Sequence, residues 1–234
     1  MTDLIEEQKA YYEARAGEYD EWWERRRRYD LGPDGNRAWG EEAEAVRGML
    51  DELPLGGHVL EFAGGTGLWT VYLARRATRV TVLDASPAMT AVSRARLEAA
   101  GLLDRVEFRM VDLFTWKPSE QFDHAFAGFW ISHVPEERLD AFLGTAAAAL
   151  KPGGILAILE GQGTRLRSPL QYTSREDGDI EIRTLNDGSK FRIVKRDIDP
   201  EDIVNRLGRA GLQARVRLTA GQFLLAIACK TGTA

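Results

Sequence analysis

The sequence predicts a doubly wound α/β domain, built on a seven-stranded, mostly parallel sheet with an antiparallel C-terminal edge. Two patterns indicate this fold class. From residue 58 to residue 159, short apolar segments alternate with segments of helical composition, which is typical of a parallel sheet with right-handed crossovers. Near the C-terminus, only the turn at Ala220 and Gly221 separates two apolar segments, and strands joined by a short turn are antiparallel.

Five strands and three helices are expected in the alternating part of the chain. The strands are predicted at residues 58–62, 79–84, 105–111, 121–128 and 155–159. The helices between them are predicted at residues 68–77, 86–100 and 135–150. Ser86 and Pro87 indicate the start of the second helix, because serine caps a helix and proline is favoured at its first position. In such a sheet, ligands lie beyond the carboxyl ends of the strands, at the switch point.

The segments before residue 54 are expected to be helical. Residues 3–29 are rich in Glu, Arg, Ala and Tyr and contain no proline, so they predict one long helix. The glycines and proline of residues 31–35 predict a break, and a second helix is expected at residues 38–53.

The C-terminal part predicts a hairpin, a helix and two strands. Asn186, Asp187 and Gly188 are a strong turn signal between strands expected at residues 179–185 and 190–196. A helix is expected from Asp199 to Ala210, and the last two strands at residues 213–218 and 222–228. We therefore expect one domain in four parts, which are a helical cap (1–53), a cofactor-binding core (54–160), a hairpin cap insertion (161–198) and a C-terminal helix with strands (199–234).

Composition limits the partners that are expected. The chain has 234 residues with 31 basic and 36 acidic side chains, a formal net charge of −5. A protein that grips phosphate backbones usually has the opposite balance, so no nucleic acid partner is expected. The N-terminus has no apolar stretch of signal-peptide length, and no run approaches the length of a membrane span. We expect a cytoplasmic monomer or homodimer that does not bind membranes.

The segment from Glu61 to Gly67 follows the first predicted strand and is rich in glycine. Gly64, Gly65 and Gly67 allow a ligand to approach the backbone closely. The dinucleotide pattern G-x-G-x-x-G, started at Gly65, would need its third glycine at Thr70. Glu61 at the strand end would repel a pyrophosphate but would suit a cationic amino-acid head group, so the dinucleotide interpretation is disfavoured.

Two more acids end the next two predicted strands. Asp84 ends the second strand and can accept hydrogen bonds from two ribose hydroxyls. Asp112 ends the third strand, where it can meet the amino group of adenine. A ligand that has an adenosine and a cationic side but no phosphate is S-adenosylmethionine (SAM). The alternative, a plain tight turn at the loop, does not account for three acids at three successive strand ends.

With these motifs the sequence resembles the class I SAM-dependent methyltransferases. The resemblance covers roughly residues 11–159 and rests on residues 59–67, 82–86, 111–113 and 151–154. Ala63 stands where the family has its first loop glycine, and we expect a backbone there that needs no positive φ. Other segments, such as Phe129 to Pro135, resemble small bacterial O- and N-methyltransferases of natural-product biosynthesis, with phosphonate O-methyltransferases of the dehydrophos type the most similar.

The resemblance implies a Rossmann-like methyltransferase fold, a helical N-terminal lid over SAM, and S-adenosylhomocysteine (SAH) as the product. It places Tyr11 and Tyr19 against SAM and Arg15 on the SAM carboxylate. The complete set of expected cofactor contacts is Tyr11, Arg15, Tyr19, Glu61, Ala63, Gly64, Gly65, Gly67, Trp69, Asp84, Ala85, Ser86, Met89, Asp112, Leu113, Phe129 and Trp130.

The residues that contact the methyl acceptor are expected after the fourth strand and in the hairpin. His133 follows that strand and is a candidate general base or orienter of the nucleophile, and Tyr19 is the second candidate catalytic residue. The alternative for His133 is a helix-entry histidine bonded to backbone. The remaining candidate substrate contacts are Trp22, Trp23, Tyr29, Arg183 and Lys195.

Each of these acceptor contacts has a structural alternative. The aromatic side chains of the N-terminal segment could simply dock a helix on the core. Lys195 lies on an apolar face of its strand, so it and Arg183 are candidates to bind an acidic group of the substrate, or they are solubilising charges on an edge hairpin.

The favoured function is SAM-dependent methylation, by in-line displacement, of oxygen or nitrogen in a small metabolite of specialised metabolism. The alternatives are a methyltransferase that acts on a macromolecule (tRNA or protein), a non-catalytic SAM-binding module and a dehydrogenase-like module. After the fourth strand, Gly128-Phe129-Trp130-Ile131 replaces the tetrad typical of amino-methylating enzymes with nucleic acid targets. The three histidines lack ligand spacing with nearby acids, so no metal is expected.

Overall fold

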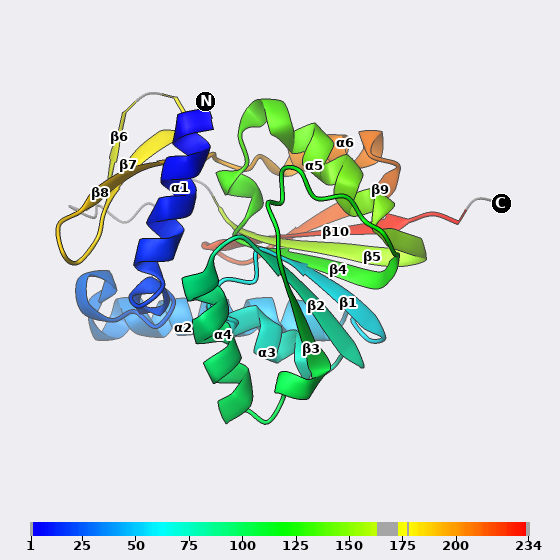
Figure 1. The fold of residues 1–234 in the computed structure, drawn as a ribbon, viewed down its shortest axis with the longest axis horizontal. Helices are drawn as coiled ribbons and strands as arrows, with labels where there is room; N and C mark the ends of the chain where they lie inside the picture. The colour runs from blue at the N-terminus through cyan, green and yellow to red at the C-terminus, as the bar shows by residue number, and fades with distance from the viewer. Residues whose placement is uncertain (1, 163–172, 177, 233–234) are drawn as a thin grey trace.

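A computed structural model describes residues 2–162, 173–176 and 178–232. Its main sheet has seven strands in the order β3-β2-β1-β4-β5-β10-β9, with β10 antiparallel to both of its neighbours (Figure 1). The strands are β1 (His58–Phe62), β2 (Arg79–Asp84), β3 (Val106–Met110), β4 (Phe122–Gly128), β5 (Leu150–Gly161), β9 (Leu212–Leu218) and β10 (Phe223–Lys230). The predicted fold class, a mostly parallel sheet with an antiparallel C-terminal edge, is confirmed.

Helices cover both faces of this sheet (Figure 1). Helices α2 (Gly32–Asp51), α3 (Leu68–Ala74) and α4 (Pro87–Ala99) pack on one face, and α5 (Glu136–Ala148) and α6 (Pro200–Arg209) on the other. Helix α1 (Thr2–Arg15) contacts the start of α4 and lies beside a second, smaller sheet. Four short 3₁₀ turns complete the helical elements: η1 (Tyr19–Glu21), η2 (Arg27–Tyr29), η3 (Leu103–Arg105) and η4 (Ile131–His133).

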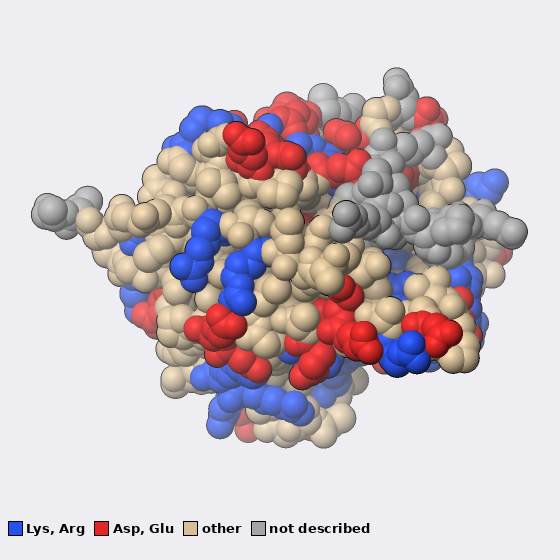
Figure 2. Space-filling model, turned by 180° about the vertical axis from the view of Figure 1, so that it is seen from behind, with Lys and Arg blue, Asp and Glu red and all other residues tan. Residues whose placement is uncertain are grey.

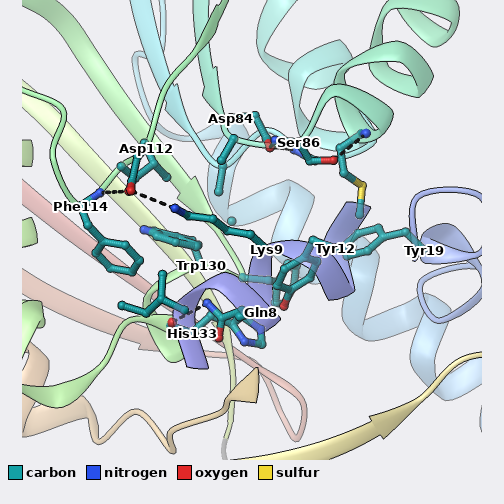
Figure 3. A pocket seen from close by; sticks show the side chains of 18 residues that line it. Gln8, Lys9, Tyr12, Tyr19, Asp84, Ser86, Asp112, Phe114, Trp130 and His133 are labelled. Carbon is teal, nitrogen blue, oxygen red and sulfur yellow. Dashed lines mark hydrogen bonds and ion pairs between the residues drawn. The ribbon is translucent and has the colours of Figure 1, made fainter. Parts of the chain in front are cut away.

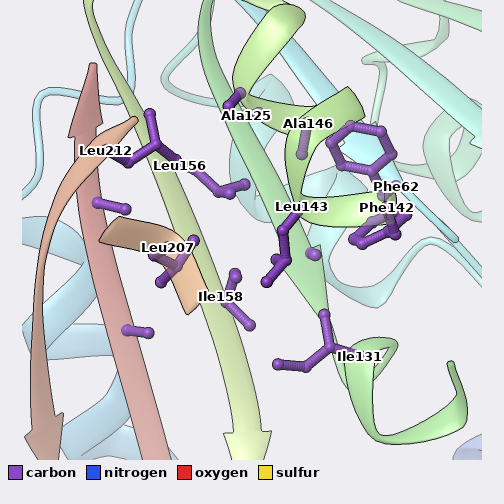
Figure 4. Packing of buried hydrophobic residues seen from close by; sticks show 14 of the residues in the cluster. Phe62, Ala125, Ile131, Phe142, Leu143, Ala146, Leu156, Ile158, Leu207 and Leu212 are labelled. Atoms are coloured by element: carbon purple, nitrogen blue, oxygen red, sulfur yellow. The ribbon is translucent and has the colours of Figure 1, made fainter. Parts of the chain in front are cut away.

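The apolar residues of the central strands divide between two cores. In β5, Leu156 and Ile158 face the core under α5 and α6, whereas Ala157 and Leu159 face the opposite core. Successive side chains of a strand point to opposite faces, so a continuous apolar strand fills both layers. Figure 4 shows the core under α5, where Phe142 packs against Phe62 with ring centroids 5.2 Å apart.

Strand order reverses between β1 and β4, which pair directly. The chain runs outward from β1 through β2 to β3, and then returns to the other side of β1. The crossovers therefore lie on different faces and diverge at the carboxyl ends of β1 and β4. That divergence leaves room for a ligand at this edge.

The predicted hairpin is one part of a three-stranded sheet. Strands β7 (Ile180–Thr184) and β8 (Lys190–Val194) pair across the turn, and β6 (Thr173–Arg175), which was not predicted, pairs with β7. Gly188 has a φ of +89°, which the turn requires. The turn docks on the N-terminal segment, because the backbone N–H of Asn186 donates to Glu18 at 2.9 Å.

The prediction of one helix over residues 3–29 is wrong. Helix α1 ends at Arg15, and the chain continues through η1 and η2. Arg25 and Arg27 have positive φ values of 52° and 53°, which a helix cannot accommodate. The aromatic side chains after Arg15 pack into the core instead, and this tertiary packing overrides the helical composition.

The second helix begins earlier than predicted. Residues 31–35 were interpreted as a break, but α2 starts at Gly32. Pro33 lies in the first turn of α2, where its missing N–H removes no helical hydrogen bond. Other boundaries differ by a few residues: α3 stops at Ala74, three residues before the predicted end, and β5 starts at Leu150 because that residue already pairs with Phe122.

Charged side chains of both signs share the surface. Figure 2 shows acidic and basic side chains mixed across the back of the molecule, with basic side chains gathered along its lower edge. Many of them are paired; Arg206, for example, bonds Asp202 at 2.6 Å and Asp140 at 3.0 Å. Among the helices that the structure describes, none is both long enough and apolar enough to cross a bilayer.

Candidate active site

A cavity of about 740 Å³, counting the space at its open mouth, lies at the carboxyl ends of the parallel strands. Helix α1 forms one wall, and the loops after β1, β2, β3 and β4 form the others (Figure 3). The lining residues are Ile5, Gln8, Lys9, Tyr12, Tyr19, Ala63, Gly65, Asp84, Ala85, Ser86, Met89, Asp112, Leu113, Phe114, Gly128, Phe129, Trp130 and His133.

Two glycines of the loop after β1 pack the loop against its neighbours. A Cβ atom on Gly64 would lie 2.3 Å from Val82 Cγ1, and one on Gly67 would lie 2.3 Å from Ser93 Oγ. Gly67 also has a φ of +80°. These glycines were predicted as cofactor contacts. They do not line the cavity, and they act instead by bringing the loop close to β2 and α4.

Ala63 has a φ of +52°, so the expectation that this position needs no positive φ is wrong. The next residues explain the conformation: the chain turns so that the Gly65 N–H donates to Asp84 Oδ2 at 2.8 Å. A left-handed conformation costs a non-glycine residue roughly 1–2 kcal/mol. Ala63 tolerates it, with its side chain against the cavity.

Asp84 is held at the end of β2 by backbone donors. Its Oδ2 accepts from Gly65 N and its Oδ1 from Ser86 N, each at 2.8 Å. Burial raises the pKa of this carboxyl, and the N–H donors oppose that shift. A carboxylate has about four acceptor positions, so the backbone donors leave room for a hydroxyl group of a ligand. Ser86 caps α4 by accepting from Met89 N at 3.0 Å.

Asp112, just after β3, forms an ion pair with Lys9 of α1, and both residues line the cavity. Lys9 Nζ of α1 lies 3.0 Å from Asp112 Oδ2, and Phe114 N donates to Oδ1 at 2.8 Å (Figure 3). Burial alone would raise the pKa of Asp112, but the hydrogen bonds from Lys9 and Phe114 and the charges of Lys9 and Arg138 together lower it. Lys9 therefore competes with any ligand amino group for this carboxylate.

Glu61 lies behind the loop and outside the cavity lining. Its side chain is buried, Oε2 has no hydrogen-bond partner among the described residues, and Thr70 Oγ1 nearby is likewise unpartnered. Burial raises the pKa of Glu61 to about 8. Trp69, a second predicted cofactor contact, is 7% exposed and packs on Trp23 and Phe126, so the structure places it in the core.

His133 lies at the other end of the cavity, in η4. Its Nδ1 is 2.7 Å from the carbonyl oxygen of Val194 in β8. The ring edge of Tyr12 meets the imidazole, with centroids 5.5 Å apart. Burial and the nearby charge of Lys195 lower the pKa of His133 well below its usual value, so the ring is neutral at pH 7.

Cations gather behind His133. Lys195 Nζ donates to Ser132 Oγ at 2.8 Å, and Ser132 donates in turn to the buried carboxylate of Glu160 through both its N–H and its Oγ. Burial lowers the pKa of Lys195 and raises that of Glu160. Arg183 pairs with Glu181 at 2.6 Å, and its buried Nε has no acceptor among the described residues. Neither cation reaches the cavity lining.

The aromatic N-terminal residues divide between cavity and core. Tyr19 lines the cavity, with the guanidinium of Arg15 4.8 Å from its ring centroid, and burial raises the pKa of Tyr19 to about 12. Tyr11 does not line the cavity; it packs on Leu185 and Ile193 in a small core of its own.

Four further predicted contacts lie outside the lining. Trp22 and Trp23 belong to an aromatic cluster with Phe129, Trp39 and Phe223. Tyr29 is buried and accepts a hydrogen bond from Arg15 at 3.1 Å. Arg15 itself is buried, and its Nε has no acceptor among the described residues.

Several lining residues were missed by the sequence analysis. Ile5, Gln8, Lys9 and Tyr12 recur at helical spacing, which places them on one face of α1. That periodicity is a usable signal, but the sequence analysis named Tyr11 and Arg15 from this helix and not Tyr12. Phe114 and Gly128 also line the cavity. Among the described residues, no group of three or more His, Cys, Asp or Glu could hold a metal ion.

Comparison with known proteins identifies the class. A methyltransferase-domain family matches residues 59–154. DhpI, whose structure was solved in complex with SAH, is 34% identical in sequence to this chain. The match covers 100% of both chains, and the two structures superpose with a TM-score of 0.76. A DhpI–SAM–HEP complex is 36% identical and covers 96% of this chain and 97% of that one, with a TM-score of 0.75.

Curated sequences agree on the class over shorter lengths. A ubiquinone biosynthesis O-methyltransferase of Paramagnetospirillum magneticum is 37% identical over 97 residues, which cover 42% of this chain and 37% of that protein. For the first four curated relatives, the chain spans between 37% and 64% of their length. The chain belongs to the class I SAM-dependent methyltransferase family.

The positive φ of Ala63 gives a test on stability. Because glycine adopts this conformation without steric cost, we expect Ala63→Gly to raise the free energy of unfolding by about 1 kcal/mol. Gly65→Ala, at a φ of +55° and with the new Cβ only in ordinary contact with Ala63 O at 4.0 Å, should lower it by about the same amount. Urea denaturation of both variants measures this, and a shift of the same sign in both would contradict it.

The buried carboxyl of Glu61 gives a test on pH dependence. Its pKa is about 8 in the folded chain, against 4.5 ordinarily, so the unfolded state loses the proton first as pH rises. This group's contribution to stability is therefore complete below pH 4.5 and is lost between pH 4.5 and 8, by roughly 3–5 kcal/mol.

The glutamine of Glu61→Gln cannot ionise. We therefore expect the melting temperature of this variant, relative to that of the wild type, to increase steadily across that pH range. Melting curves at pH 4 to 9 compare the two proteins. A constant difference between their curves at every pH would show that Glu61 ionises normally.

Proposed function

We propose that this chain methylates an oxygen or nitrogen of a small acceptor that carries an acidic group. The observation that carries the proposal is the division of the cavity into two electrostatically different halves. Carboxylates at the ends of β2 and β3 line one half. Lys195 and Arg183, each close to a buried carboxylate, stand behind the other. The bound donor supplies a sulfonium-linked methyl group that is open to in-line displacement.

The residues of the first half suit SAM. Asp84 retains acceptor positions for the ribose hydroxyls, and Asp112 for the adenine amino group. Met89, Leu113, Phe114 and Trp130 offer apolar contacts to the adenine ring. The faces of Tyr12 and Tyr19 stabilise positive charge. The Nε–H of Arg15, which has no acceptor among the described residues, fits the SAM carboxylate.

The residues of the second half suit an acidic acceptor. The buried Nε–H of Arg183 lacks an acceptor in the part of the chain that the structure describes, and an unpaired buried donor costs roughly 1–3 kcal/mol until a ligand group satisfies it. Lys195 lies close enough to His133 to lower its pKa. An acid attracted by these two cations, which stand behind the lining, would present its methyl-accepting atom beside His133. The phenol of Tyr19, neutral at working pH, donates a hydrogen bond rather than removing a proton.

A macromolecular acceptor is the second candidate. The cavity lies under α1, so a polymer could present only a side chain or a single base to it. A small molecule can enter the cavity as a whole, so a small acceptor is favoured. Specialised metabolism is favoured by the sequence resemblance, whereas several curated relatives are named for ubiquinone biosynthesis; the identity of the acceptor decides between them.

An acceptor panel tests the function. Purified protein is incubated with SAM and with a small phosphonate, a small carboxylate or a neutral catechol, and SAH is quantified. We expect turnover with an acid and little with the catechol. Titration with SAM and with NADH is the control. Tight binding of NADH without binding of SAM, or turnover with the catechol alone, would refute the proposal.

The role of Lys195 gives a second test. Lys195 stands behind the lining, so Lys195→Met removes a nearby positive charge and not a direct contact. It should raise KM for the acidic acceptor about tenfold and leave KM for SAM unchanged. Lys190→Met is the matched control, because Lys190 is an exposed lysine at the other end of β8. Arg183→Gln tests the same site independently. Equal KM values for the acceptor in all variants would exclude the cationic half from binding.

A further inference from the structure

Three elements meet in a closed ring of hydrogen bonds at the acceptor end of the cavity. Val194 N of β8 donates to Gln8 Oε1 at 2.9 Å, and Gln8 Nε2 donates to the carbonyl of His133 at 3.0 Å. His133 Nδ1 closes the ring on the carbonyl of Val194 at 2.7 Å. Gln8 and His133 lie next to one another in Figure 3. The ring links α1, η4 and the smaller sheet.

This ring determines where the proton of the His133 side chain lies. A carbonyl oxygen only accepts hydrogen bonds, so Nδ1 must carry the hydrogen. A neutral imidazole has one N–H and one lone pair, so the lone pair lies on Nε2. No described residue donates a hydrogen bond to Nε2, and His133 lines the cavity. The Nε2 lone pair is therefore left for a ligand.

Gln8 is the component that holds the ring together. Strand β8 pairs with β7 along one edge, and its other edge faces α1. On that edge, Gln8 fixes the N–H of Val194, whose carbonyl receives His133. Gln8 is 3% exposed, so water does not substitute readily for its amide. Glu7 bonds the same edge at Arg192 N at 2.7 Å but does not contact His133.

We propose that Gln8 is a positioning residue that fixes His133 in the Nδ1–H tautomer, so that Nε2 accepts a hydrogen bond from an O–H or N–H group of the acceptor. This inference rests on the proposed function and adds a property of its substrate. The acceptor has to present a proton beside its acidic group. A fully ionised or tertiary group at that point would meet only a lone pair.

Imidazole ¹⁵N NMR of the SAH complex tests the tautomer directly. The signals of His133 are assigned by their loss in His133→Ala, since the chain has three histidines. We expect only the Nδ1–H form in the wild type and a substantial Nε2–H population in Gln8→Met. Gln8→Asn, which is too short to span Val194 N and His133 O together, should act in the same direction with less disruption of the fold.

Kinetics provide the second readout. We expect kcat for the acceptor to fall about tenfold in Gln8→Met, as for the loss of one hydrogen bond to the reacting group, with KM for SAM unchanged. Glu7→Ala is the control: it loosens α1 from the same strand edge and should leave the tautomer and kcat as in the wild type. A single Nδ1–H form in both Gln8 variants would overturn the inference, as would a tautomer shift in Glu7→Ala equal to that in Gln8→Met.

The inference and the proposed function fail separately. If no acceptor in the panel is methylated but the Gln8 variants shift the tautomer, the positioning role stands and the function is wrong. If methylation proceeds and the tautomer does not move, the positioning role is wrong and the function stands.

Discussion

The reversal of strand order between β1 and β4 is the constraint on which the rest of the site depends. Since the crossovers on the two sides of β1 lie on different faces, the loops at this point move apart and leave the cavity. Because β1 to β4 are parallel, their carboxyl ends share one edge of the sheet. Asp84, Asp112 and His133 are distant in sequence and meet at this edge for that reason alone.

The two halves of the cavity stabilise charge in different ways. On the donor side, backbone N–H groups of Gly65 and Ser86 hold the Asp84 carboxylate, and that arrangement needs Gly64 and Gly67 to bring the loop close. On the acceptor side, Lys195 is compensated by Ser132 and Glu160, not by a ligand. Buried charges of this kind are tolerated only when they are paired and hydrogen-bonded, so the acceptor half is polar before any substrate arrives.

The sequence predicted the parts of the site that depend on local pattern. Strand ends, the glycine loop and the acids that follow β2 and β3 can be read from alternation and spacing alone. The conformation of Ala63 could not be, because it depends on the contact of Gly65 with Asp84, nineteen residues away. The end of α1 at Arg15 could not be read from the sequence either, because burial of the aromatic side chains that follow outweighs helical propensity. For a related reason the sequence did not indicate that Tyr12, and not Tyr11, lines the cavity: the rotation of α1 is set by its contact with β8.

That contact between α1 and β8 explains why a helix so distant in sequence from the loops after β3 and β4 belongs to the site. An edge strand presents unpaired N–H groups, which have to be covered. On β8, Glu7 and Gln8 cover the N–H groups of Arg192 and Val194 with side chains. Helix α1 and the smaller sheet therefore stabilise each other, while Lys9 ties the same helix to Asp112 on the donor side. A single helical face thus touches both halves of the cavity, so the geometry at His133 cannot be independent of the geometry at Asp112.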